Sequence, residues 1–418
     1  MVQAKAMSRP LDRIVIINDR SLALGGSAAL SLLSARLFLE RGIPVTYISG
    51  DEGADSPLAT DVELISLGWR QLLDRPLLNR GATGLYNRAA ENMVSAFIHA
   101  RDTPGTAYHL HSWHQILSPA VFRALRPVED RLVISTHDFS LVCPNGGYQN
   151  YQRGEVCGLT PLSGPCLATH CDKRSYADKA WRVARMLILR QMMEMRRTRA
   201  LIATIHPTMH SWLARGGIEP SRLRAVRNPV TPFLNQRVEA EKNSDLFFIG
   251  RVESEKGVDL ALEAARLAGR RVRVIGDGAM CARLRADYPD FVWEGWRTHS
   301  DIARLIGAAR ALIMPSRLPE PFGLVALEAM QCGVPLVAFG DAFVAREAAE
   351  LGAALIAAEK TAASLGAALG LLKSDAAVRQ LSECAYARAG ALSHTPQGWR
   401  DALIALYQEQ IAKPGAEA

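Results

Sequence analysis

Residues 315–335 read P-S-R-L-P-E-P-F-G-L-V-A-L-E-A-M-Q-C-G-V-P. The apolar run 311–314 leads into this stretch, a proline-rich turn follows, and a helical pattern begins at Gly323. Glu320 therefore lies in the turn, and Glu328 lies about a turn and a half into the helix. The pattern predicts a strand, a turn and a helix, with one carboxylate at the mouth of the helix and one further along it.

The start of this helix is a candidate anion site. Its first N–H groups, at Gly323, Leu324 and Val325, have no partner inside the helix, and the positive end of the helix dipole lies there. Glycine also lets a phosphate approach the backbone closely. Phosphate donors between two carboxylates suit a sugar nucleotide, with Glu328 on the ribose hydroxyls and Glu320 on the sugar. The alternative is an ordinary strand–turn–helix with two solvated glutamates.

E-P-F-G-L-V-A-L-E, followed by A-M-Q-C-G-V-P-L-V-A, closely resembles the E-x7-E region of retaining GT-B glycosyltransferases of family 4. The resemblance covers nearly the whole chain in order, and its C-terminal half is the more specific. It implies an α/β fold with two Rossmann-like, doubly wound domains that face each other across a cleft, and a C-terminal helix that crosses back to the first domain. It also places Phe322, inside the motif, among the donor-binding residues.

Length and composition agree with a two-domain enzyme. The 418 residues suit two domains of roughly 200 residues each. Hydrophobic residues at 49% and charged residues at 22% are typical of a globular protein. The net charge of +7 favours anionic partners, among which composition cannot choose.

The predicted organisation has three parts. Residues 1–231 form an acceptor-side domain, 232–395 a nucleotide-sugar donor domain, and 396–418 a crossover helix and tail; the polar segment 232–244 marks the boundary. The opening residues lack the apolar core of a signal peptide, and no apolar run approaches the ~20 residues that span a bilayer. We therefore expect a cytoplasmic protein, with a peripheral position at the inner face of the membrane as an open alternative, and we expect its cysteines to be thiols or metal ligands.

The chain begins with a βαβ unit. A β-branched strand at 13–18 is followed by a turn at Gly25 and Gly26 and by a helix over 28–40, for which Ser27 is the candidate N-cap. A Gly-Gly turn at the carboxyl end of a strand is where ligands of open α/β sheets bind. Alone it is a bare turn; the resemblance implies that Gly25 and Gly26 face the donor phosphates.

Two predicted strands end in histidines. Tyr108-His-Leu-His ends one strand with His111, and the strand 132–136 ends at His137 and Asp138. A histidine at a strand end is most often only a polar loop residue. The family has similar strand-end histidines on the acceptor side of its cleft, which implies that His111, His137 and Asp138 lie there. The resemblance further implies that His137 contacts the donor sugar or helps organise the reaction.

A cysteine-rich segment follows. Cys143, Cys157, Cys166 and Cys171 are spaced C-x13-C-x8-C-x4-C, among many Gly, Pro and Asn residues. Such a segment buries little of its own and gains order from a metal, so a structural zinc site is one hypothesis. The spacing is not that of a recognised zinc ribbon, and a thiol-bearing loop is the alternative. A subset of family 4 enzymes carries a similar insertion.

An arginine-rich helix is predicted over 181–199. It is either an amphipathic helix with a solvated face or a contact with an anionic bilayer that carries a lipid-linked acceptor.

The second domain repeats the strand–turn–helix pattern with charged turns. In G-R-V-E-S-E-K-G, Arg251 and Lys256 flank a loop and are apt partners for a pyrophosphate whose negative charge grows as it leaves. By itself the loop is equally a surface salt-bridge turn. Gly276 and Gly278 resemble the G-x-G that closes over the nucleotide in the family, although they are not the full dinucleotide fingerprint.

Three further expectations concern the same domain. In the family, the turn after the strand that corresponds to the one beginning at Phe291 usually meets the base, so the resemblance implies that Trp296 or Arg297 does so here. Asp301 is expected to cap the next helix. Where the family has a Gly-Gly…Glu signature the chain reads D-A-F-V-A-R-E; Glu347 corresponds to the glutamate, but the glycines are absent.

The resemblance thus implies a retaining hexosyltransferase that moves a sugar from a nucleoside diphosphate to a glycan or lipid-linked acceptor, in bacterial cell-surface polysaccharide synthesis. No metal-binding Asp-x-Asp motif lies near the predicted donor site, so we expect no cofactor in catalysis. Arg251 and Lys256 are then expected to stabilise the leaving pyrophosphate. Two rivals stay open: another GT-B chemistry, such as a nucleotide-sugar epimerase or a phosphorylase, and a non-catalytic nucleotide-sugar binding protein. Nucleic-acid binding rests on charge alone and ranks last.

Overall fold

The computed structural model describes residues 10–23 and 25–412, apart from the side chains of 77–79. The chain divides into two compact units: the first comprises 1–147, 159–226 and 397–418, and the second comprises 148–158 and 227–396. The main division lies close to the predicted boundary after residue 231. The return of the last helix to the first unit is also what the fold class implied.

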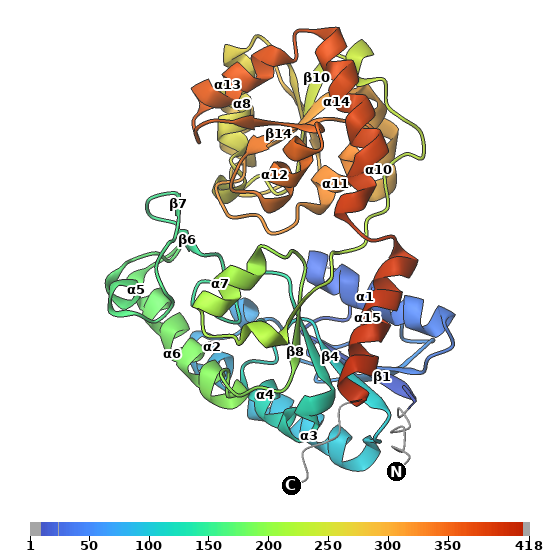
Figure 1. Cartoon of the computed structure of the whole chain (residues 1–418). Coiled ribbons are helices and arrows are strands. Elements are labelled where there is room, and N and C mark those ends of the chain that lie inside the picture. The colour runs from blue at the N-terminus through green and yellow to red at the C-terminus, as the bar shows by residue number, and fades with distance from the viewer. Residues whose placement is uncertain (1–9, 24, 413–418) are drawn as a thin grey trace, which may run out of the picture. The chain divides into compact units, whose positions relative to one another are not determined.

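The first unit is built on a parallel sheet whose strand order is β3-β2-β1-β4-β5-β8-β9. This doubly wound order places the first strand near the middle, where it is buried on both faces (Figure 1). The strands are β1 (Arg13–Asn18), β2 (Val45–Ser49), β3 (Glu63–Ser66), β4 (Thr106–Leu110), β5 (Leu132–Thr136), β8 (Leu201–Thr204) and β9 (Leu223–Ala225).

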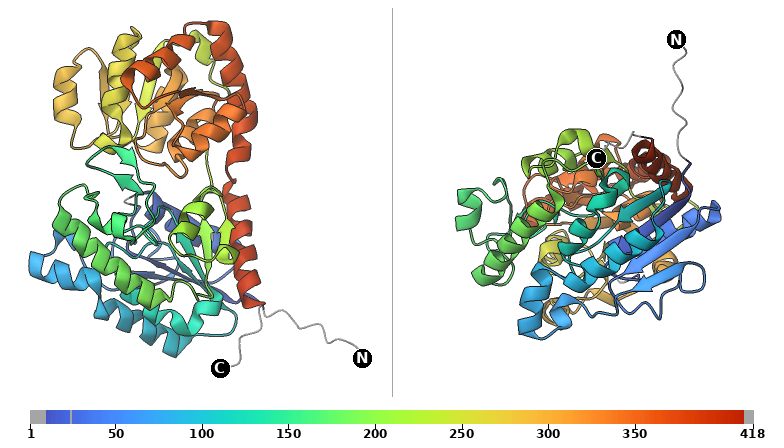
Figure 2. Two further views of the ribbon diagram at one scale, coloured as in Figure 1. Left: turned by 60° about the vertical axis from the view of Figure 1, so that its left-hand side comes forward. Right: turned by 90° about the horizontal axis from the view of Figure 1, so that it is seen from below.

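Helices pack against this sheet, and α15 joins its core through Trp399, Leu403 and Tyr407. Figure 2 shows α6 running alongside α2, which it contacts. The helices are α1 (Gly26–Glu40), α2 (Leu77–Leu85), α3 (Arg88–Arg101), α4 (Ala120–Ala124), α5 (Gly164–Ala168), α6 (Tyr176–Met193), α7 (Met209–Arg215) and α15 (Pro396–Ile411), with 3₁₀ turns η1 (Leu72–Asp74), η2 (Arg126–Arg131) and η3 (Pro220–Arg222).

The second unit has its own parallel sheet, in the order β12-β11-β10-β13-β14-β15. Its strands are β10 (Asp245–Ile249), β11 (Val272–Ile275), β12 (Val292–Gly295), β13 (Ala309–Met314), β14 (Leu336–Phe339) and β15 (Ala354–Ala357). The short hairpin of β6 (Gln149–Asn150) and β7 (Glu155–Val156) is counted with this unit.

The helices of the second unit cover this sheet, and α8 and α13 supply much of one buried layer. They are α8 (Val258–Leu267), α9 (Cys281–Asp287), α10 (His299–Leu305), α11 (Leu324–Met330), α12 (Phe343–Glu350), α13 (Ala362–Leu371) and α14 (Asp375–Arg388), with 3₁₀ turns η4 (Ala240–Lys242), η5 (Ser254–Lys256), η6 (Ile306–Ala308) and η7 (Ala389–Leu392).

Three local predictions were wrong at helix ends. The N-cap of α1 is Gly25 and not Ser27, which lies in the first turn. The arginine-rich helix α6 covers 176–193 and not 181–199, because Glu194 takes a left-handed conformation with φ 44° that ends it. Thr298 caps α10, and Asp301 is its reciprocal partner in a capping box.

Within the described residues, no helix is long and apolar enough to cross a bilayer.

Candidate functional site

The second unit brings two of the predicted catalytic residues into contact. Lys256 ends η5, and its Nζ donates to Glu320 Oε2 at 2.5 Å, while Ser316 Oγ donates to the same oxygen at 3.3 Å. Gly257 makes this possible, because a Cβ there would lie 2.0 Å from the carbonyl oxygen of Pro315. Its φ of 68° also favours glycine. The turn after β10 and the proline-rich turn after β13 therefore pack closely enough to pair the lysine with the glutamate.

Glu320 is held as a carboxylate. Burial works to raise its pKa, but the charge and hydrogen bond of Lys256, with Ser316 and the charge of Arg251, lower the pKa below its ordinary value. Arg251 is the exposed member of this group: its side chain is 65% exposed, and its ion pair with Glu255 is long, at 3.7 Å. A cation of this kind is free to close on an incoming anion.

Glu328 has a different environment. It lies on α11, and burial raises its pKa to about 7. His299 on α10 lies beside it, with its Nε2 3.8 Å from Glu328 Oε1. His299 was not expected from the sequence, where it is one polar residue in the T-H-S-D run before a helix. The two glutamates of the motif thus differ in protonation behaviour as well as in position.

The backbone between them has the predicted form. Gly323 is the N-cap of α11, with φ 73°, and a Cβ at this position would lie 3.2 Å from the nearest atoms of Met314 and Val344. α11 itself begins at Leu324, so the N–H groups of Leu324 and Val325 precede the first helical bonds. Phe322 is buried in the interior, so its side chain serves packing, and only its backbone is available for a donor.

The glycines after β11 have a packing reason of their own. A Cβ at Gly276 would lie 1.9 Å from the carbonyl oxygen of Gly250, and one at Gly278 would lie 2.5 Å from that of Val252. Val252 N also donates to the carbonyl oxygen of Asp277 at 2.9 Å. These contacts bring the loop after β11 against the Arg251 loop, whether or not a nucleotide binds there.

Two other expectations in this unit have mixed outcomes. Trp296 is 70% exposed after β12 and is available for a base, while Arg297 forms an ion pair with Glu294 at 3.1 Å. Glu347, on α12, is held by both terminal nitrogens of Arg227 at 2.7 Å each. The glutamate at the position of the family signature is therefore paired with a side chain of its own unit.

The first unit places its strand-end histidines in a row. Tyr407 Oη lies 2.6 Å from His109 Nδ1, the His109 and His111 rings are 4.0 Å apart, and His111 Nδ1 lies 3.3 Å from His137 Nε2. The His111 and His137 rings are nearly parallel, with an angle of 13° between their planes. His109 also meets Ser135 Oγ at 2.8 Å. Neighbouring strands β4 and β5 bring the two predicted histidines together.

All three imidazoles are held neutral. Burial lowers the pKa of His109 to about 3, that of His137 to about 4, and that of His111 well below its ordinary value. Among the described residues, His111 Nε2 and His137 Nδ1 are buried without a hydrogen-bond partner. Buried polar atoms are usually paired, so these nitrogens are candidates for bonds to a ligand hydroxyl.

The residues that support this row were only partly predicted. Asp138 accepts from the backbone N–H of Ser140 at 2.8 Å and so shapes the turn after β5. Asp19, which was not among the predicted residues, is buried and accepts from the N–H groups of Gln115, Ile116 and Leu117 at 2.8–2.9 Å. Its position directly after β1, at a carboxyl strand end, was the available signal.

Gly25 and Gly26 stand exposed at the start of α1, and no atom lies within 4 Å of a Cβ built at either. Their expected contact with donor phosphates stays a prediction.

The cysteine-rich segment is organised around a lysine. Lys179, buried on α6, donates to Cys171 Sγ at 2.9 Å and to the carbonyl oxygen of Cys166 at 3.1 Å. Burial works against the ammonium, but its hydrogen bond to Cys171 and the neighbouring thiols raise the pKa of Lys179 above its ordinary value. Cys143 Sγ is bonded to the side chain of Asn145 at 3.1 Å.

The described side chains of this segment are arranged around the lysine ammonium. Across residues 10–23 and 25–412, no group of three or more His, Cys, Asp or Glu side chains is arranged to hold a metal. The cation among the thiols of the first unit is the lysine, and Cys157 belongs to the hairpin counted with the second unit. The zinc site of Cys143, Cys157, Cys166 and Cys171 therefore stays a prediction, and we derive no step from a metal.

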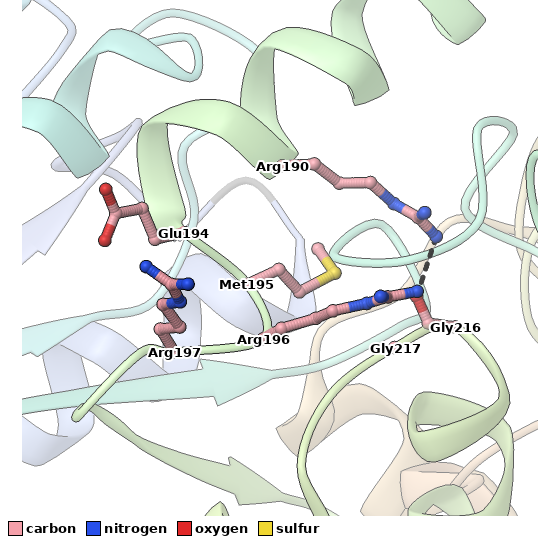
Figure 3. A pocket seen from close by; sticks show the side chains of 7 residues that line it. All are labelled: Arg190, Glu194, Met195, Arg196, Arg197, Gly216 and Gly217. Atoms are coloured by element: carbon pink, nitrogen blue, oxygen red, sulfur yellow. Dashed lines mark hydrogen bonds between the residues drawn. The ribbon is translucent and has the colours of Figure 1, made fainter.

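The end of α6 forms a basic hollow, which Figure 3 shows from close by. Arg190 donates to the carbonyl oxygen of Gly216 at 2.7 Å, and Glu194 forms an ion pair with Arg126. Arg196 and Arg197 follow the end of the helix and are exposed.

Comparison with known proteins gives a match to one family model. Residues 231–388 match the family described as "Glycosyl transferases group 1". The match covers most of the second unit and less than half of the chain. The matched region contains Arg251, Lys256, Glu320 and Glu328, the residues of the candidate donor site.

Among curated proteins, the chain is similar to the GDP-mannose-dependent alpha-mannosyltransferase of Mycobacterium tuberculosis (strain CDC 1551 / Oshkosh), with 32% identity over 139 residues. The alignment covers 33% of this chain and 35% of that protein, so the chain spans only about a third of its length.

Two solved structures have the same fold. Sucrose-phosphate synthase from Thermosynechococcus elongatus superposes with a TM-score of 0.71 at 16% identity, over 96% of this chain and 99% of that one. WaaG, a glycosyltransferase involved in lipopolysaccharide biosynthesis, superposes with a TM-score of 0.64 at 17% identity, over 93% of this chain and 99% of that one. The fold is that of the GT-B glycosyltransferases, as the motif predicted.

Proposed function

We propose that the protein is a retaining glycosyltransferase of family 4. It transfers a hexosyl group from a nucleoside-diphosphate sugar to a glycan or lipid-linked acceptor. The observation that carries the proposal is the mostly buried Lys256–Glu320 pair beside the exposed guanidinium of Arg251, within the region that matches the family "Glycosyl transferases group 1". The GDP-mannose dependence in the name of the mycobacterial relative supports a nucleotide-sugar donor.

In the proposed mechanism the donor binds the second unit. Arg251 and Lys256 stabilise the diphosphate as its charge grows, aided by the N–H groups of Leu324 and Val325. Glu320, kept ionised, accepts hydrogen bonds from the sugar hydroxyls, and Glu328 accepts from the ribose hydroxyls. Two cationic side chains at the diphosphate thus take the role that a metal has in other transferases, and catalysis requires no cofactor.

The chemical step exchanges one bond for another on the same face of the sugar. The anomeric carbon loses its bond to the phosphate oxygen and gains one to the acceptor oxygen, while the acceptor proton passes to the leaving phosphate. This front-face course keeps the configuration and needs no protein nucleophile. His137, in the first unit, is held neutral and has a free Nδ1, so its role is to position a hydroxyl by a hydrogen bond and not to act as a charged acid.

We further propose a cytoplasmic enzyme of cell-surface polysaccharide synthesis that lies peripherally on the inner face of the membrane. The exposed Arg196 and Arg197 beside the hollow of Figure 3 suit lipid phosphates, and Tyr176 and Leu187 on α6 are exposed apolar side chains of the same helix. The role of WaaG in lipopolysaccharide biosynthesis supports the assignment to surface glycans.

A second candidate is a non-catalytic nucleotide-sugar binding protein or a GT-B epimerase. It is favoured by one observation: the missing Gly-Gly signature and the pairing of Glu347 with Arg227.

The anomeric configuration of the product separates these functions. The protein is incubated with α-linked UDP- and GDP-sugars and a mixture of simple glycan acceptors, and the product is followed by proton NMR. We expect an α-linked product, or slow release of the α-configured free sugar to water. A β product would contradict retention, an epimerised donor would identify an epimerase, and binding without turnover would identify a binding protein.

A further inference from the structure

The first unit contains an arginine-lined cavity of about 470 Å³ that the proposed mechanism does not use. It lies where α6 meets α2, and these helices run side by side (Figure 2). Four arginines line it: Arg80, Arg174, Arg182 and Arg185. Its volume is that of an ordinary small-molecule site.

Arg185 is the buried cation of this cavity. The centre of its guanidinium lies 5.1 Å from the ring of Trp113 and 5.4 Å from that of Trp181, and one terminal nitrogen donates to the carbonyl oxygen of His114 at 2.7 Å. Among the described residues its Nε is buried without a partner. Burial lowers the pKa of Arg185 to about 10, although the charge of Asp19 opposes that shift. A buried charge without an ion-pair partner is costly unless a counter-ion occupies the site.

The other arginines leave the cavity with excess positive charge. Arg182 forms an ion pair with Asp172 at 2.8 Å. The guanidinium groups of Arg80 and Arg174 form no ion pair within the described part of the chain, although the backbone N–H of Arg174 donates to Asp172 Oδ1 at 3.0 Å. Asp178 is the acid in the lining, and its carboxylate accepts from Ser175 Oγ at 2.6 Å at the N-terminus of α6. The lining therefore contains one carboxylate and four guanidinium groups, and of these four only Arg182 forms an ion pair.

The same cavity has an apolar side. Leu72 and Leu73 line it from η1, and Leu73 is 54% exposed. The indole of Trp181 also lines the cavity, and its Nε1 donates to the carbonyl oxygen of Gly81 at 3.1 Å. An indole face and two leucines suit the apolar face of a sugar ring or an alkyl chain next to an anionic group.

The cavity adjoins the histidine row. A second, smaller cavity shares His114, Arg182 and Arg185 with it and continues to Ser140. Ser140 is the residue whose N–H is bonded to Asp138, directly after His137. A ligand in the arginine cavity therefore lies beside the loop that carries the predicted acceptor-side residues.

We propose that this cavity binds an oxyanion group of the acceptor, a phosphate or a carboxylate, while the acceptor hydroxyl meets His137. Guanidinium forks bind both oxyanions in the same way, so the shared chemistry is a planar or tetrahedral anion. The inference rests on the proposed function, and it makes the acceptor an acidic sugar or a phosphate-linked one.

The test measures binding of inorganic pyrophosphate and of glucuronate by titration calorimetry at low salt. All proteins carry Arg251→Ala and Lys256→Ala, which removes the expected phosphate site of the second unit. In that background we compare the double variant Arg80→Gln/Arg174→Gln with a control double variant that has the same charge change outside the cavity, Arg36→Gln/Arg41→Gln. All four arginines are at least partly exposed, so the folds should persist, and circular dichroism checks this.

We expect at least one probe to bind, and the cavity variant to lose about tenfold or more in affinity, as two charge-assisted contacts predict. The control should change less than about threefold, which is what long-range screening of the same charge gives. Pyrophosphate binding would assign a phosphate-linked acceptor, and glucuronate binding alone would assign an acidic sugar. No binding of either probe, or equal losses in both variants, would overturn the proposal.

Failure of this inference is distinguishable from failure of the proposed function. Donor binding is measured separately on the protein with Arg251 and Lys256 intact. If a donor binds but neither oxyanion does, the proposed function stands and only the proposed oxyanion site is wrong. If an oxyanion binds but no donor does, the proposed transferase function is wrong, and the cavity is still an oxyanion site.

Discussion

Lys256 donates a hydrogen bond to Glu320 across 2.5 Å and so joins the turn after β10 to the turn after β13. The pair is mostly buried, with 23% and 18% of the two side chains exposed. Each residue needs the other: the glutamate stays ionised because the ammonium is there, and the ammonium is fixed where a diphosphate would arrive.

Removal of the cation of this pair should impair both transfer and stability. Lys256→Ala should lower transfer at least about 100-fold, because a cation that stabilises the leaving group acts mainly in the transition state. It should also lower the melting temperature, because Glu320 is left buried without its partner. Lys242→Ala is the control, since Lys242 pairs with Glu239 on the surface. Steady-state kinetics and a thermal melt check both parts; equal effects in the two variants would contradict the assignment.

The raised pKa of Glu328 should make the stability of the protein depend on pH. Since its pKa rises from 4.5 to about 7 on folding, the folded protein binds more protons than the unfolded chain between these values. The contribution of Glu328 to stability is therefore highest below about pH 4.5 and falls as the pH rises to about 7, by at most about 3 kcal/mol. Glu328→Gln should remove this slope. Melting temperatures of the wild type and the variant should diverge at pH 8 in favour of the variant and converge near pH 5; a constant difference would contradict the shift.

The third prediction concerns His137. Because burial lowers its pKa to about 4, His137 is neutral from pH 6 to 8 and contributes no titration to the transfer rate in that range. His137→Ala should lower transfer by about tenfold to 100-fold, and His137→Asn should restore part of it, since an amide also donates a hydrogen bond while neutral. Transfer rates of the two variants from pH 6 to 8 check this, with the exposed His99→Ala as control. Loss of a pH step near 6.5 in His137→Ala alone would mean that the imidazole titrates there.

The fourth prediction separates packing from ligand binding among the glycines. A methyl at Gly276 meets the carbonyl oxygen of Gly250 at 1.9 Å, at a φ of 140°, so Gly276→Ala should destabilise the second unit by about 2 kcal/mol or more. Gly26→Ala places its methyl in open space in the first turn of α1 and should stay within about 0.5 kcal/mol of the wild type. Denaturant unfolding of both variants checks this; equal stabilities would show that the loop after β11 relaxes freely.

The sequence predicted the features that local pattern determines. Strands such as β1 and β5 are β-branched runs buried on both faces, and their carboxyl ends carry the polar residues that later meet. The E-x7-E spacing placed Glu320 in a turn and Glu328 on a helix, as found. These elements depend on neighbours in the chain, so the sequence alone sufficed.

Features that depend on distant neighbours were missed or misassigned. Nothing adjacent to Lys179 indicates that its ammonium lies among thiols, and the arginines of α6 were interpreted as one surface although Arg185 points between two indoles. The sequence does not reveal where the charged end of a long side chain lies, because its flexible aliphatic part can place that charged group either in solvent or in the interior.

The most direct measurement is donor binding by thermal shift on the wild type and on Arg251→Ala with Lys256→Ala, with a panel of UDP- and GDP-sugars. A bound donor raises the melting temperature in proportion to RT ln(1 + [L]/Kd). We predict one donor with a clear shift in the wild type, most of which the double variant loses. A panel with no shift, or a shift that the double variant keeps in full, would contradict the placement of the donor at Lys256 and Glu320.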